Sequence, residues 1–499
     1  MANVHELKKR GYTAFQEGRI QDALTQYIAA TRKSPKDDEA WNMLAVLHGM
    51  TGNLDDAEIC CQRALQLRPH AAPTYNNLGL ILKQKGRIPE SIDCFRRSLE
   101  ASPTHAPTLN NLASVLREAG AKNEALSLYQ KAITFNPDYA EAHSNLGALL
   151  QEIGRIQEAL QSYQRAVRLE PSDIRWLMNF GCGLREAGRM EESARVFQRV
   201  LQLAPQNALA WDGLSHAQLE LRRYAEAGAS GLHAIELDPG LSPAYLHAGA
   251  AFQAAGHTEQ AVDLFRRLLT IDPTNESAHY FLAIASGESV PDKSPAEYVR
   301  DLFDGYAETF DDSLVKKLEY RTPTLLAGFA GELLGNDGKK IDIIDLGCGT
   351  GLCGPLFRPF AHRLVGVDLA PKMIAKAQER GVYDELLVDD LIPPLLASPG
   401  GFDLVLAADV FVYLGALDQV FDATKTALRH DGLFMFSTEK EESTAEFVLR
   451  SSGRYAHART YVRDLAATLG FAILSIEDVV LRKESGNDIQ GNIYVLRRD

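Results

Sequence analysis

A short glycine-rich stretch holds the residues whose types and spacing best suit chemistry. The apolar run 341–346 contains Asp345, and glycines follow at every second position, Gly347, Gly349 and Gly351. Glycine adopts backbone conformations that other residues avoid, and it lets a ligand approach the main chain closely. A buried parallel strand that ends in such a loop, followed by a helix, presents free backbone N–H groups at the carboxyl edge of a sheet. We therefore expect the chemistry at that edge.

Acid–base candidates lie further along, at the ends of later predicted strands and in a late loop. His457 has the intrinsic pKa best suited to a general base near neutral pH. Asp409 and Tyr413 are the other favoured catalytic candidates, and Glu439 and Tyr455 are further possible bases. Asp409 is equally suited to shaping a bound cofactor. A surface loop histidine with no chemical role is the alternative interpretation of His457. None of the six cysteines forms a CxxC pair and no four are grouped as a zinc site needs, so we expect no metal site.

These residues require elements that alternate along the chain. Strand patterns cover residues 341–346, 363–368, a stretch ending at 387–390, 402–409 and 432–437, and a terminal hairpin joins 472–482 to 492–497. Helical patterns lie between them, near 352–360, 371–380, 415–428 and 461–469. This alternation predicts a doubly wound α/β sheet. A dinucleotide site would require G-x-G-x-x-G, but Leu352 stands where the third glycine belongs.

The pattern Asp345-x-Gly347-x-Gly349-x-Gly351 resembles motif I of class I S-adenosylmethionine-dependent methyltransferases. Residues 298–499 as a whole resemble predicted methyltransferases that contain tetratricopeptide repeats and are related to the ubiquinone-biosynthesis methyltransferase group. The stretches 301–307, 407–415 and 453–458 carry that likeness. The resemblance implies S-adenosylmethionine as the cofactor, and it leaves the methyl acceptor undefined.

The resemblance also implies roles for single residues. Asp368 would accept the ribose hydroxyls, Met373 would pack on adenine, and Asp390 with Leu391 would read the adenine amino group. The string Tyr306-Ala-x-x-Phe310-Asp is similar to the lid of the family, in which an aromatic closes over the cofactor. The implied cofactor-binding set is Tyr306, Asp345, Gly347, Gly349, Gly351, Asp368, Met373, Asp390, Leu391 and Ala408.

The first part of the chain is a repeat. Prolines recur at intervals of 34 residues, at Pro35, Pro69, Pro103, Pro137, Pro171, Pro205, Pro239 and Pro273. A small residue stands twelve positions before each proline, and an aromatic usually stands eight before it. Each unit contains two helical patterns, and neither can bury its apolar stripe alone, so the units must stack. This pattern resembles the tetratricopeptide repeat family and predicts an all-α solenoid over residues 4–286, with 276–286 as the capping helix.

Asparagines recur in register on the first helix of four units, at Asn77, Asn111, Asn145 and Asn179. A carboxamide offers a donor and an acceptor, so it can bind an extended peptide backbone without reading its sequence. The row is similar to the asparagine ladder of the O-linked N-acetylglucosamine transferase family, which holds substrate polypeptides. The alternative is that these side chains only close hydrogen bonds within the repeats.

Composition and charge limit the remaining possibilities. Residues 291–499 hold 23 Lys and Arg against 33 Asp and Glu, a balance of −10 within the net −14 of the chain. Such an acidic half repels phosphate backbones, so we expect no nucleic acid partner. No apolar run is long enough to span a bilayer, and no signal peptide precedes the repeats, which predicts a cytoplasmic protein.

The sequence thus predicts a repeat domain over 4–286, a Gly-, Ser- and Pro-rich linker over 287–297 and a catalytic domain over 298–499. The favoured function is methyl transfer from S-adenosylmethionine, with repeats that recruit a protein or present a peptide. A small-molecule methyltransferase, acting on a quinone-like or phenolic acceptor with the repeats used for localisation, is the first alternative. A non-catalytic scaffold is the second.

Overall fold

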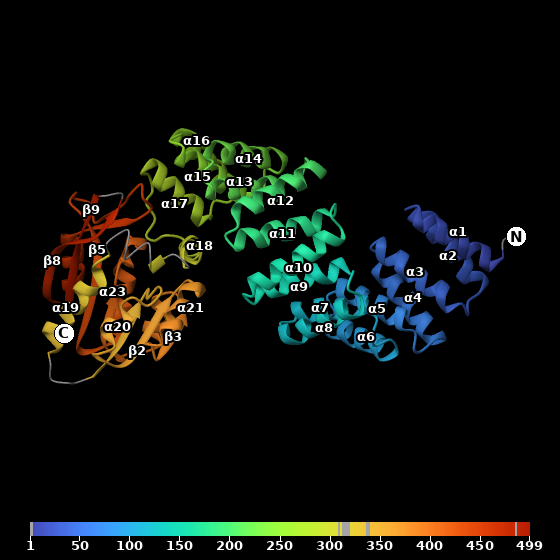
Figure 1. Cartoon of the computed structure of the whole chain (residues 1–499), viewed down its shortest axis with the longest axis horizontal. Coiled ribbons are helices and arrows are strands. Elements are labelled where there is room, and N and C mark those ends of the chain that lie inside the picture. The colour runs from blue at the N-terminus through green and yellow to red at the C-terminus, as the bar shows by residue number, and fades with distance from the viewer. Residues whose placement is uncertain (1–2, 308–309, 312–319, 336–339, 485–486) are drawn as a thin grey trace. The chain divides into compact units, whose positions relative to one another are not determined.

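The computed structural model describes residues 3–307, 310–311, 320–335, 340–484 and 487–499. The chain forms two compact units, Met1–Arg222 and Arg223–Asp499, which are described separately (Figure 1).

The first unit consists of paired helices that follow the 34-residue period. They are α1 Val4–Gln16, α2 Ile20–Lys33, α3 Asp38–Met50, α4 Leu54–Leu67, α5 Ala72–Gln84, α6 Ile88–Ala101, α7 Ala106–Glu118, α8 Lys122–Phe135, α9 Ala140–Glu152, α10 Ile156–Leu169, α11 Ile174–Glu186, α12 Met190–Leu203 and α13 Ala208–Glu220. Within a repeat the two helices join through a turn that holds a residue such as Gly86 or Gly154 at positive φ. The short turns make the pair antiparallel, as the predicted solenoid requires.

Small residues let the two helices of each repeat approach closely. A Cβ added to Gly79 of α5 would lie 2.6 Å from the ring of Phe95 of α6, and a Cβ on Gly147 would lie 2.7 Å from the ring of Tyr163. Both rings belong to the aromatic row of the sequence, and both are buried. The aromatic therefore fills the space that the glycine leaves, which explains why the two positions recur together.

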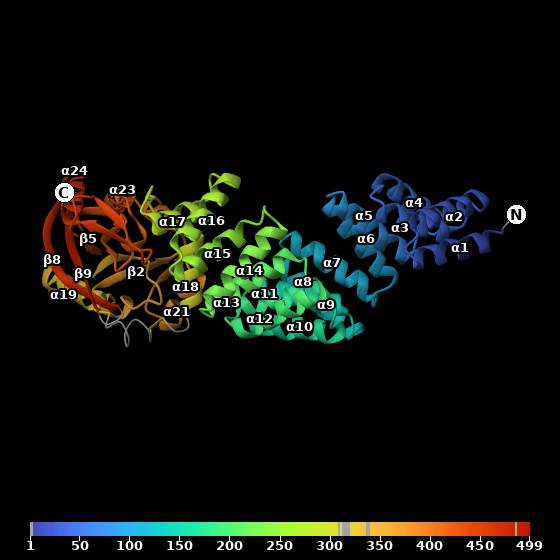
Figure 2. The ribbon, with the colours of Figure 1, turned by 90° about the horizontal axis from the view of Figure 1, so that it is seen from above.

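The second unit begins with further helices and continues into a sheet (Figure 2). The helices before the sheet are α14 Tyr224–Leu237, α15 Ser242–Ala254, α16 Thr258–Ile271, α17 Glu276–Ser286, α18 Ala296–Tyr306 and α19 Thr322–Leu334. The strands are β1 Ile341–Leu346, β2 Ala361–Asp368, β3 Glu385–Val388, β4 Phe402–Ala407, β5 Leu428–Glu441, β6 Phe447–Leu449, β7 Tyr455–Ala458, β8 Phe471–Glu484 and β9 Asn487–Arg498.

The sheet is doubly wound, as the alternation predicts. Strands β3, β2, β1, β4 and β5 lie in this order and run parallel, and β9 adds antiparallel to β5 and pairs with β8. Helices α20 Gly354–Phe357, α21 Pro371–Arg380, α22 Ile392–Leu396, α23 Asp418–Ala427 and α24 Arg459–Thr468 and the 3-10 turn η2 Phe411–Tyr413 connect the strands. One face of the sheet packs its core against α23 and α24, and the other packs against α19 and α20.

The register of the central strands brings their carboxyl ends together. Leu346 of β1 pairs with Val367 of β2 and with Ala407 of β4, and Asp368 pairs with Val388 of β3. The residues that follow these pairs therefore meet at one edge of the sheet. This edge holds the glycine loop.

Candidate active site at the carboxyl edge of the sheet

The glycine loop has the backbone that its sequence requires. Gly347, Gly349 and Gly351 have φ values of 61°, 54° and 84°, which side chains other than glycine rarely adopt. A Cβ on Gly347 would also lie 2.5 Å from the side chain of Val410. The loop can therefore be built only with glycines, and it lies at the edge of the sheet. Its N–H groups at Cys348, Gly349 and Gly351 donate within the protein.

Asp368, the last residue of β2, braces this loop. One carboxylate oxygen accepts the N–H of Gly349 at 2.9 Å, and the other accepts the N–H of Ala370 at 2.8 Å. Burial raises the pKa of this carboxyl, although both backbone donors act in the opposite direction. Each oxygen keeps a second acceptor position, so the carboxylate can bind a donor from a ligand while it holds the loop.

Asp345 lies behind the loop and does not line the cavity described below. It is 1% exposed, and the hydroxyl of Tyr383 donates to it at 2.7 Å. Burial raises the pKa of Asp345 to about 7, and the nearby charge of Asp368 adds to the effect. Asp345 therefore supports the loop and does not line the cavity, whereas the family resemblance implies a direct contact with the cofactor.

We expect the Asp345→Asn variant to have a flatter dependence of stability on pH than the wild type. An unfolded aspartate titrates near pH ~3.9, so the folded chain holds this proton more tightly than the unfolded chain does. That contribution is complete below about pH 4 and is lost as the pH rises to about 7, with a slope of at most ~1.4 kcal/mol per pH unit. Urea denaturation of both proteins across this range, followed at the sheet, measures the difference.

Asp342, at the other end of β1, is a control of opposite sign. Burial raises its pKa, but the hydrogen bonds and charges of Arg429 and His362 outweigh burial and lower it. Its contribution to stability is present at neutral pH and is lost on acidification. A variant Asp342→Asn should therefore lose stability at neutral pH. If Asp345→Asn retained the slope of the wild type, the carboxyl of Asp345 would not be the group that titrates.

A cavity of about 520 Å³ lies beside the glycine loop. One side, which we call the glycine side, is lined by Gly347, Gly349, Asp368, Asp389, Asp390, Leu391 and Ala408. The other, which we call the arginine side, is lined by Tyr298, Tyr320, Asp409, Tyr413, Gly453, Arg454 and Arg482. Apart from these polar groups the lining is largely apolar and aromatic, and the volume is within the range of small-molecule sites.

Helix α18 and the two described residues after the next gap cover the cavity. Tyr306 and Phe310 of the predicted lid both line it. Phe310 lies over the loop, since a Cβ on Gly349 would be 3.6 Å from its ring. Asp311 accepts a hydrogen bond from the Thr350 hydroxyl at 2.5 Å and so ties the lid to the loop. Met373 is fully buried in the cluster that includes Phe310, so it supports the lid and does not line the cavity.

The arginine side is held by an ion-pair network that the sequence did not predict. Arg482 is 3% exposed; it donates to Asp409 at 2.7 Å, and it also contacts Glu439. The second oxygen of Asp409 accepts the Ser437 hydroxyl at 2.9 Å, and Asp409 itself has a φ of 55°. Both oxygens of Asp409 are therefore engaged, which suits a structural anchor better than a free base. A bulge in β8 between Val480 and Arg482 directs the guanidinium to this site.

The other two catalytic candidates have different positions. Tyr413 lines the cavity, and its ring packs edge-on against Phe303 at 5.4 Å. Burial raises the pKa of Tyr413. His457 does not line the cavity: it is fully buried, donates through Nε2 to the carbonyl of Gly415 at 3.0 Å and stacks on Tyr461. Burial lowers the pKa of His457 to about 4. This placement corrects the expectation that His457 acts as the base.

The asparagine row of the first unit joins neighbouring repeats. Asn77 donates through Nδ2 to Asn42 at 2.9 Å, and Asn145 donates to Asn110 at 3.0 Å. The same bond links Asn111 to Asn76 at 3.1 Å and Asn179 to Ser144 at 2.9 Å. These four side chains are partly or fully exposed. Each carboxamide is therefore fixed by its nitrogen, while its oxygen has no hydrogen-bond partner among the residues that the structure describes.

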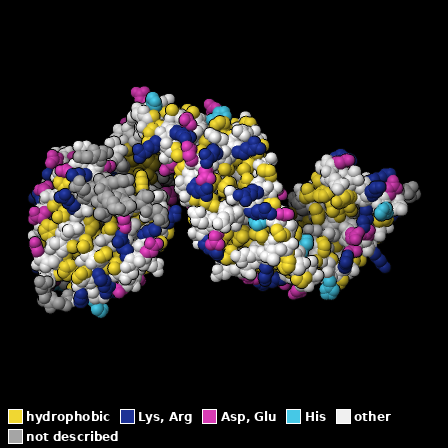
Figure 3. Space-filling view, in the orientation of Figure 1, with side chains coloured by type: hydrophobic (Ala, Val, Ile, Leu, Met, Phe, Trp, Pro, Cys, Tyr) yellow, Lys and Arg dark blue, Asp and Glu magenta, His cyan; other side chains and the backbone are white. Residues whose placement is uncertain are grey.

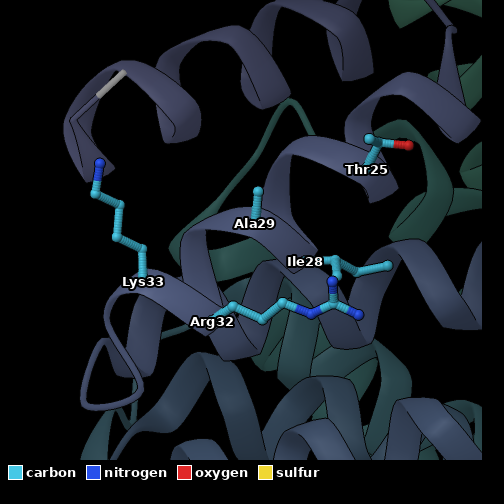
Figure 4. A pocket seen from close by; sticks show the side chains of 5 residues that line it. All are labelled: Thr25, Ile28, Ala29, Arg32 and Lys33. Atoms are coloured by element: carbon cyan, nitrogen blue, oxygen red, sulfur yellow. The ribbon is translucent and has the colours of Figure 1, made fainter. Parts of the chain in front are cut away.

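A second hollow lies on α2, far along the chain from this chemistry. It is lined by Thr25, Ile28, Ala29, Arg32 and Lys33, all from one helix (Figure 4). Neither a cluster of acid–base groups nor a glycine loop accompanies it. On the face of the repeats shown in Figure 3, basic and acidic side chains are interspersed. No helix within the described ranges is both long and apolar enough to cross a membrane.

Comparison with protein-family models identifies both parts. Residues 344–434 match a methyltransferase domain. Residues 8–72, 70–136, 140–173, 178–242 and 243–275 match tetratricopeptide repeat models. The chain combines tetratricopeptide repeats with a methyltransferase domain. The predicted family resemblance is therefore confirmed, and so is the combination of an all-α solenoid with a doubly wound α/β fold.

Curated relatives match only parts of the methyltransferase. The ubiquinone biosynthesis O-methyltransferase of Xylella fastidiosa (strain 9a5c) is 31% identical over 153 residues, which is 28% of this chain and 62% of the relative. Methyltransferase-like protein 27 of Homo sapiens is 37% identical over 106 residues, 21% of this chain and 43% of the relative. The 18S rRNA (guanine-N(7))-methyltransferase of Bos taurus is 31% identical over 78 residues, 16% of this chain and 28% of the relative. The chain thus spans less than two thirds of each.

Solved structures align with this chain at low identity. The APC/C hetero-tetramer Cut9–Hcn1 aligns at 19% identity with a TM-score of 0.44, over 56% of this chain and 55% of that chain. The repeat protein YrrB, described as having an unusual peptide-binding site, aligns at 20% identity with a TM-score of 0.34, over 38% of this chain and 96% of its own.

Proposed function

We propose that the protein is a cytoplasmic S-adenosylmethionine-dependent methyltransferase whose repeats recruit a protein or present a peptide to the catalytic site. The observation that carries the first part is the glycine loop beside Asp368 at the open edge of the sheet. The observation that carries the second is the row of oriented asparagines in the repeats.

The residues on the glycine side fit the cofactor. The loop glycines Gly347 and Gly349, the carboxylate of Asp368 and the pair Asp390 and Leu391 line one cavity. We assign Asp368 to the ribose hydroxyls and Asp390 with Leu391 to the adenine. Tyr306 and Phe310 would cover the bound molecule and exclude water. When bound, the cofactor supplies a methyl group that is already activated on a sulfonium.

The protein has mainly to hold donor and nucleophile in line, because the methyl group needs no further activation. On the arginine side, the hydrogen bonds of Asp409 with Arg482 and Ser437 fix its side chain two residues after the end of β4. The hydroxyl of Tyr413 is available to orient an acceptor atom. A base matters only for an acceptor that is protonated at the working pH, where positioned proton transfer adds about 10²–10⁴-fold.

The asparagine row suits a peptide backbone. Because the inter-repeat bond fixes each nitrogen, the carboxamide oxygen is oriented before a partner binds, which lowers the entropy cost of binding. An extended peptide could donate its N–H groups to successive oxygens. Tethering then raises the effective concentration of a weakly held acceptor to about the mM range for a short linker.

We expect the double variant Asn111→Ala, Asn145→Ala to capture less partner protein while its S-adenosylhomocysteine affinity stays at the wild-type value. Affinity capture from extract, quantified by mass spectrometry, measures the first quantity, and calorimetry measures the second. Asn123→Ala, an exposed asparagine on the second helix of a repeat, is the matched control. Equal capture by all three proteins would mean that the row serves only to join the repeats.

Labelled S-adenosylmethionine tests the function itself. The protein is incubated with extract of the source cells, and the label is then separated into a protein precipitate and an organic-soluble fraction. Label in protein that is lost with Asp368→Ala supports the proposal. Label that is confined to the organic fraction would assign a small-molecule acceptor. No label in either fraction, with intact cofactor binding, would favour a scaffold.

The small-molecule alternative has its own support. The cavity is lined by several aromatic rings, among them Phe303, Tyr320 and Tyr413, which suit a flat phenolic or quinone-like acceptor. The similarity to a ubiquinone biosynthesis O-methyltransferase points to the same class. In that case the repeats would serve for localisation.

A further inference from the structure

The cavity wall on the arginine side is continuous with the last repeat helix. The strands β6 and β7 form a hairpin whose turn, residues 452–454, lines the cavity. Two backbone bonds close this turn: Gly453 donates to Arg450 at 2.8 Å, and Arg450 donates to Arg454 at 2.9 Å. Gly453 has a φ of 76°, which residues other than glycine rarely adopt. Another residue at this position would strain the tip of the hairpin.

Tyr280 of α17 holds the tip of this hairpin from the side away from the cavity. Its ring is fully buried, and its hydroxyl donates to the carbonyl of Gly453. A Cβ on Gly453 would lie 3.1 Å from that hydroxyl and 3.5 Å from the hydroxyl of Tyr298. The glycine is therefore needed for the close approach of the repeat helix.

The same helix supports a second part of the wall. The rings of Tyr280 and Phe281 lie 5.2 Å and 5.4 Å from the ring of Tyr298, which lines the cavity. Phe281 in turn stacks on Phe265 of α16 at 5.7 Å. Aromatic rings at these distances attract one another beyond their burial. Tyr298, which lines the cavity, thus packs against aromatic residues of the last repeat helix.

The segment between α17 and α18 is a third part of the wall, although its composition is that of a linker. Ser294 donates its N–H to the carbonyl of Tyr413 at 2.9 Å, and Lys293 forms an isolated antiparallel β-bridge with Leu414. The carbonyl of Asp292 accepts the N–H of Gly415 at 2.7 Å. The Tyr455 hydroxyl donates to the carbonyl of Pro291 at 2.8 Å, which joins the segment to the hairpin.

We propose that the last repeat is a working part of the methyltransferase: α17 and residues 291–294 set the acceptor-binding wall, and Tyr280 is a positioning residue for the acceptor. This inference rests on the proposed function, in which the arginine side takes the acceptor. The Tyr280 hydroxyl itself donates to the hairpin on the arginine side. An ion pair between Lys293 and Asp390 at 3.9 Å links this wall to the glycine side, and the loss of that hydroxyl leaves the ion pair in place. Loss of the Tyr280 hydroxyl should therefore change acceptor binding and spare cofactor binding.

The test is the full-length variant Tyr280→Phe, which keeps the ring and removes only the hydroxyl. Tyr245→Phe is the matched control, since Tyr245 is also buried and donates to a carbonyl, that of Pro239, at 3.0 Å within its own repeat. Hydrogen exchange is measured for the peptide that spans the hairpin. Calorimetry gives the affinity for S-adenosylhomocysteine. Label transfer is titrated with the extract fraction that accepts label from the wild type.

We expect exchange in the hairpin to accelerate about three- to tenfold in Tyr280→Phe, as for one lost hydrogen bond. The amount of extract fraction that gives half-maximal labelling should rise by a similar factor. The half-maximal cofactor concentration and the S-adenosylhomocysteine affinity should stay within about twofold of wild type. Tyr245→Phe should match wild type in every measurement.

Wild-type exchange and labelling in Tyr280→Phe would overturn the inference, as would an equal effect of Tyr245→Phe. The inference would also be overturned if S-adenosylhomocysteine affinity fell by the same factor as the half-maximal extract amount rose. Tyr280 would then contribute only to the general stability of the domain. A wild-type protein that binds no S-adenosylhomocysteine would instead refute the proposed cofactor. In that event the hairpin exchange of the two variants still decides whether α17 holds the wall.

Discussion

Replacing Asp368 with alanine is expected to weaken the affinity for S-adenosylmethionine about 10- to 100-fold, as for a lost charged acceptor of hydrogen bonds. The carboxylate is 8% exposed and lies at the centre of the glycine side. Its loss removes the assigned partner of the ribose hydroxyls. It also leaves the N–H groups of Gly349 and Ala370 without their acceptor, so the loop loses its brace.

Calorimetry with S-adenosylhomocysteine, which lacks the reactive methyl group, measures the effect without turnover. Asp384→Ala is the matched control. Asp384 also accepts a backbone N–H from the neighbouring strand, that of Leu364 at 2.8 Å, but it precedes β3 and so lies at the opposite edge of the sheet. The control should bind with wild-type affinity. A folded Asp368→Ala protein with unchanged affinity would remove the ribose assignment.

Replacing Arg482 with methionine is expected to destabilise the second unit by about 3–5 kcal/mol. The guanidinium is buried between two carboxylates, Asp409 and Glu439, which are 13% and 3% exposed. Removing the Arg482 cation leaves the largely buried Asp409 without an ion-pair partner among the described residues, and it leaves Glu439 with only Arg450, whose side chain is 37% exposed. The cost of an uncompensated buried charge exceeds that of breaking an exposed pair.

Arg429 is an exposed counterpart of Arg482, and the tryptophans report on the first unit separately. Arg429 also bridges two carboxylates, Asp342 and Asp403, but its side chain is 42% exposed, so Arg429→Met should cost less than about 1 kcal/mol. Urea denaturation of the sheet can be followed by hydrogen exchange of β5. The three tryptophans, Trp41, Trp176 and Trp211, all lie in the first unit, so their fluorescence reports the repeats separately. That transition should not move in either variant.

Equal destabilisation by the two arginine variants would mean that burial does not set the strength of the network. A partial recovery of stability when Arg482→Met is combined with Glu439→Gln would support the charge argument, because the second change removes one of the two carboxylates that Arg482 neutralises. The two changes share a network, so their effects should not add.

The sequence by itself determined the repeat helices and the central strands. The 34-residue period is physically strict, since every unit must present the same apolar stripe to its neighbours. The predicted strand 341–346 and helix 371–380 have these bounds in the structure. The glycine loop was equally clear, because Gly347 and Gly351 meet both a positive φ and a close neighbour. These features depend on local backbone chemistry and on periodicity, and the sequence displays both.

Tertiary structure alone decided which polar residues meet at the cavity. By its intrinsic pKa His457 is the better base candidate in the sequence, but it lies in β7, whose three-residue pairing with β6 accompanies its burial, whereas Asp409 lines the cavity. The strands β6 and β7 are too short to give a clear alternation. Arg482 reaches Asp409 across 73 positions of sequence, beside a shift in the register of β8 that the sequence does not display. The residues 291–294 have a linker's composition, yet pairing with the 413–416 segment makes them part of the wall, since a backbone pairing places no demand on side chains.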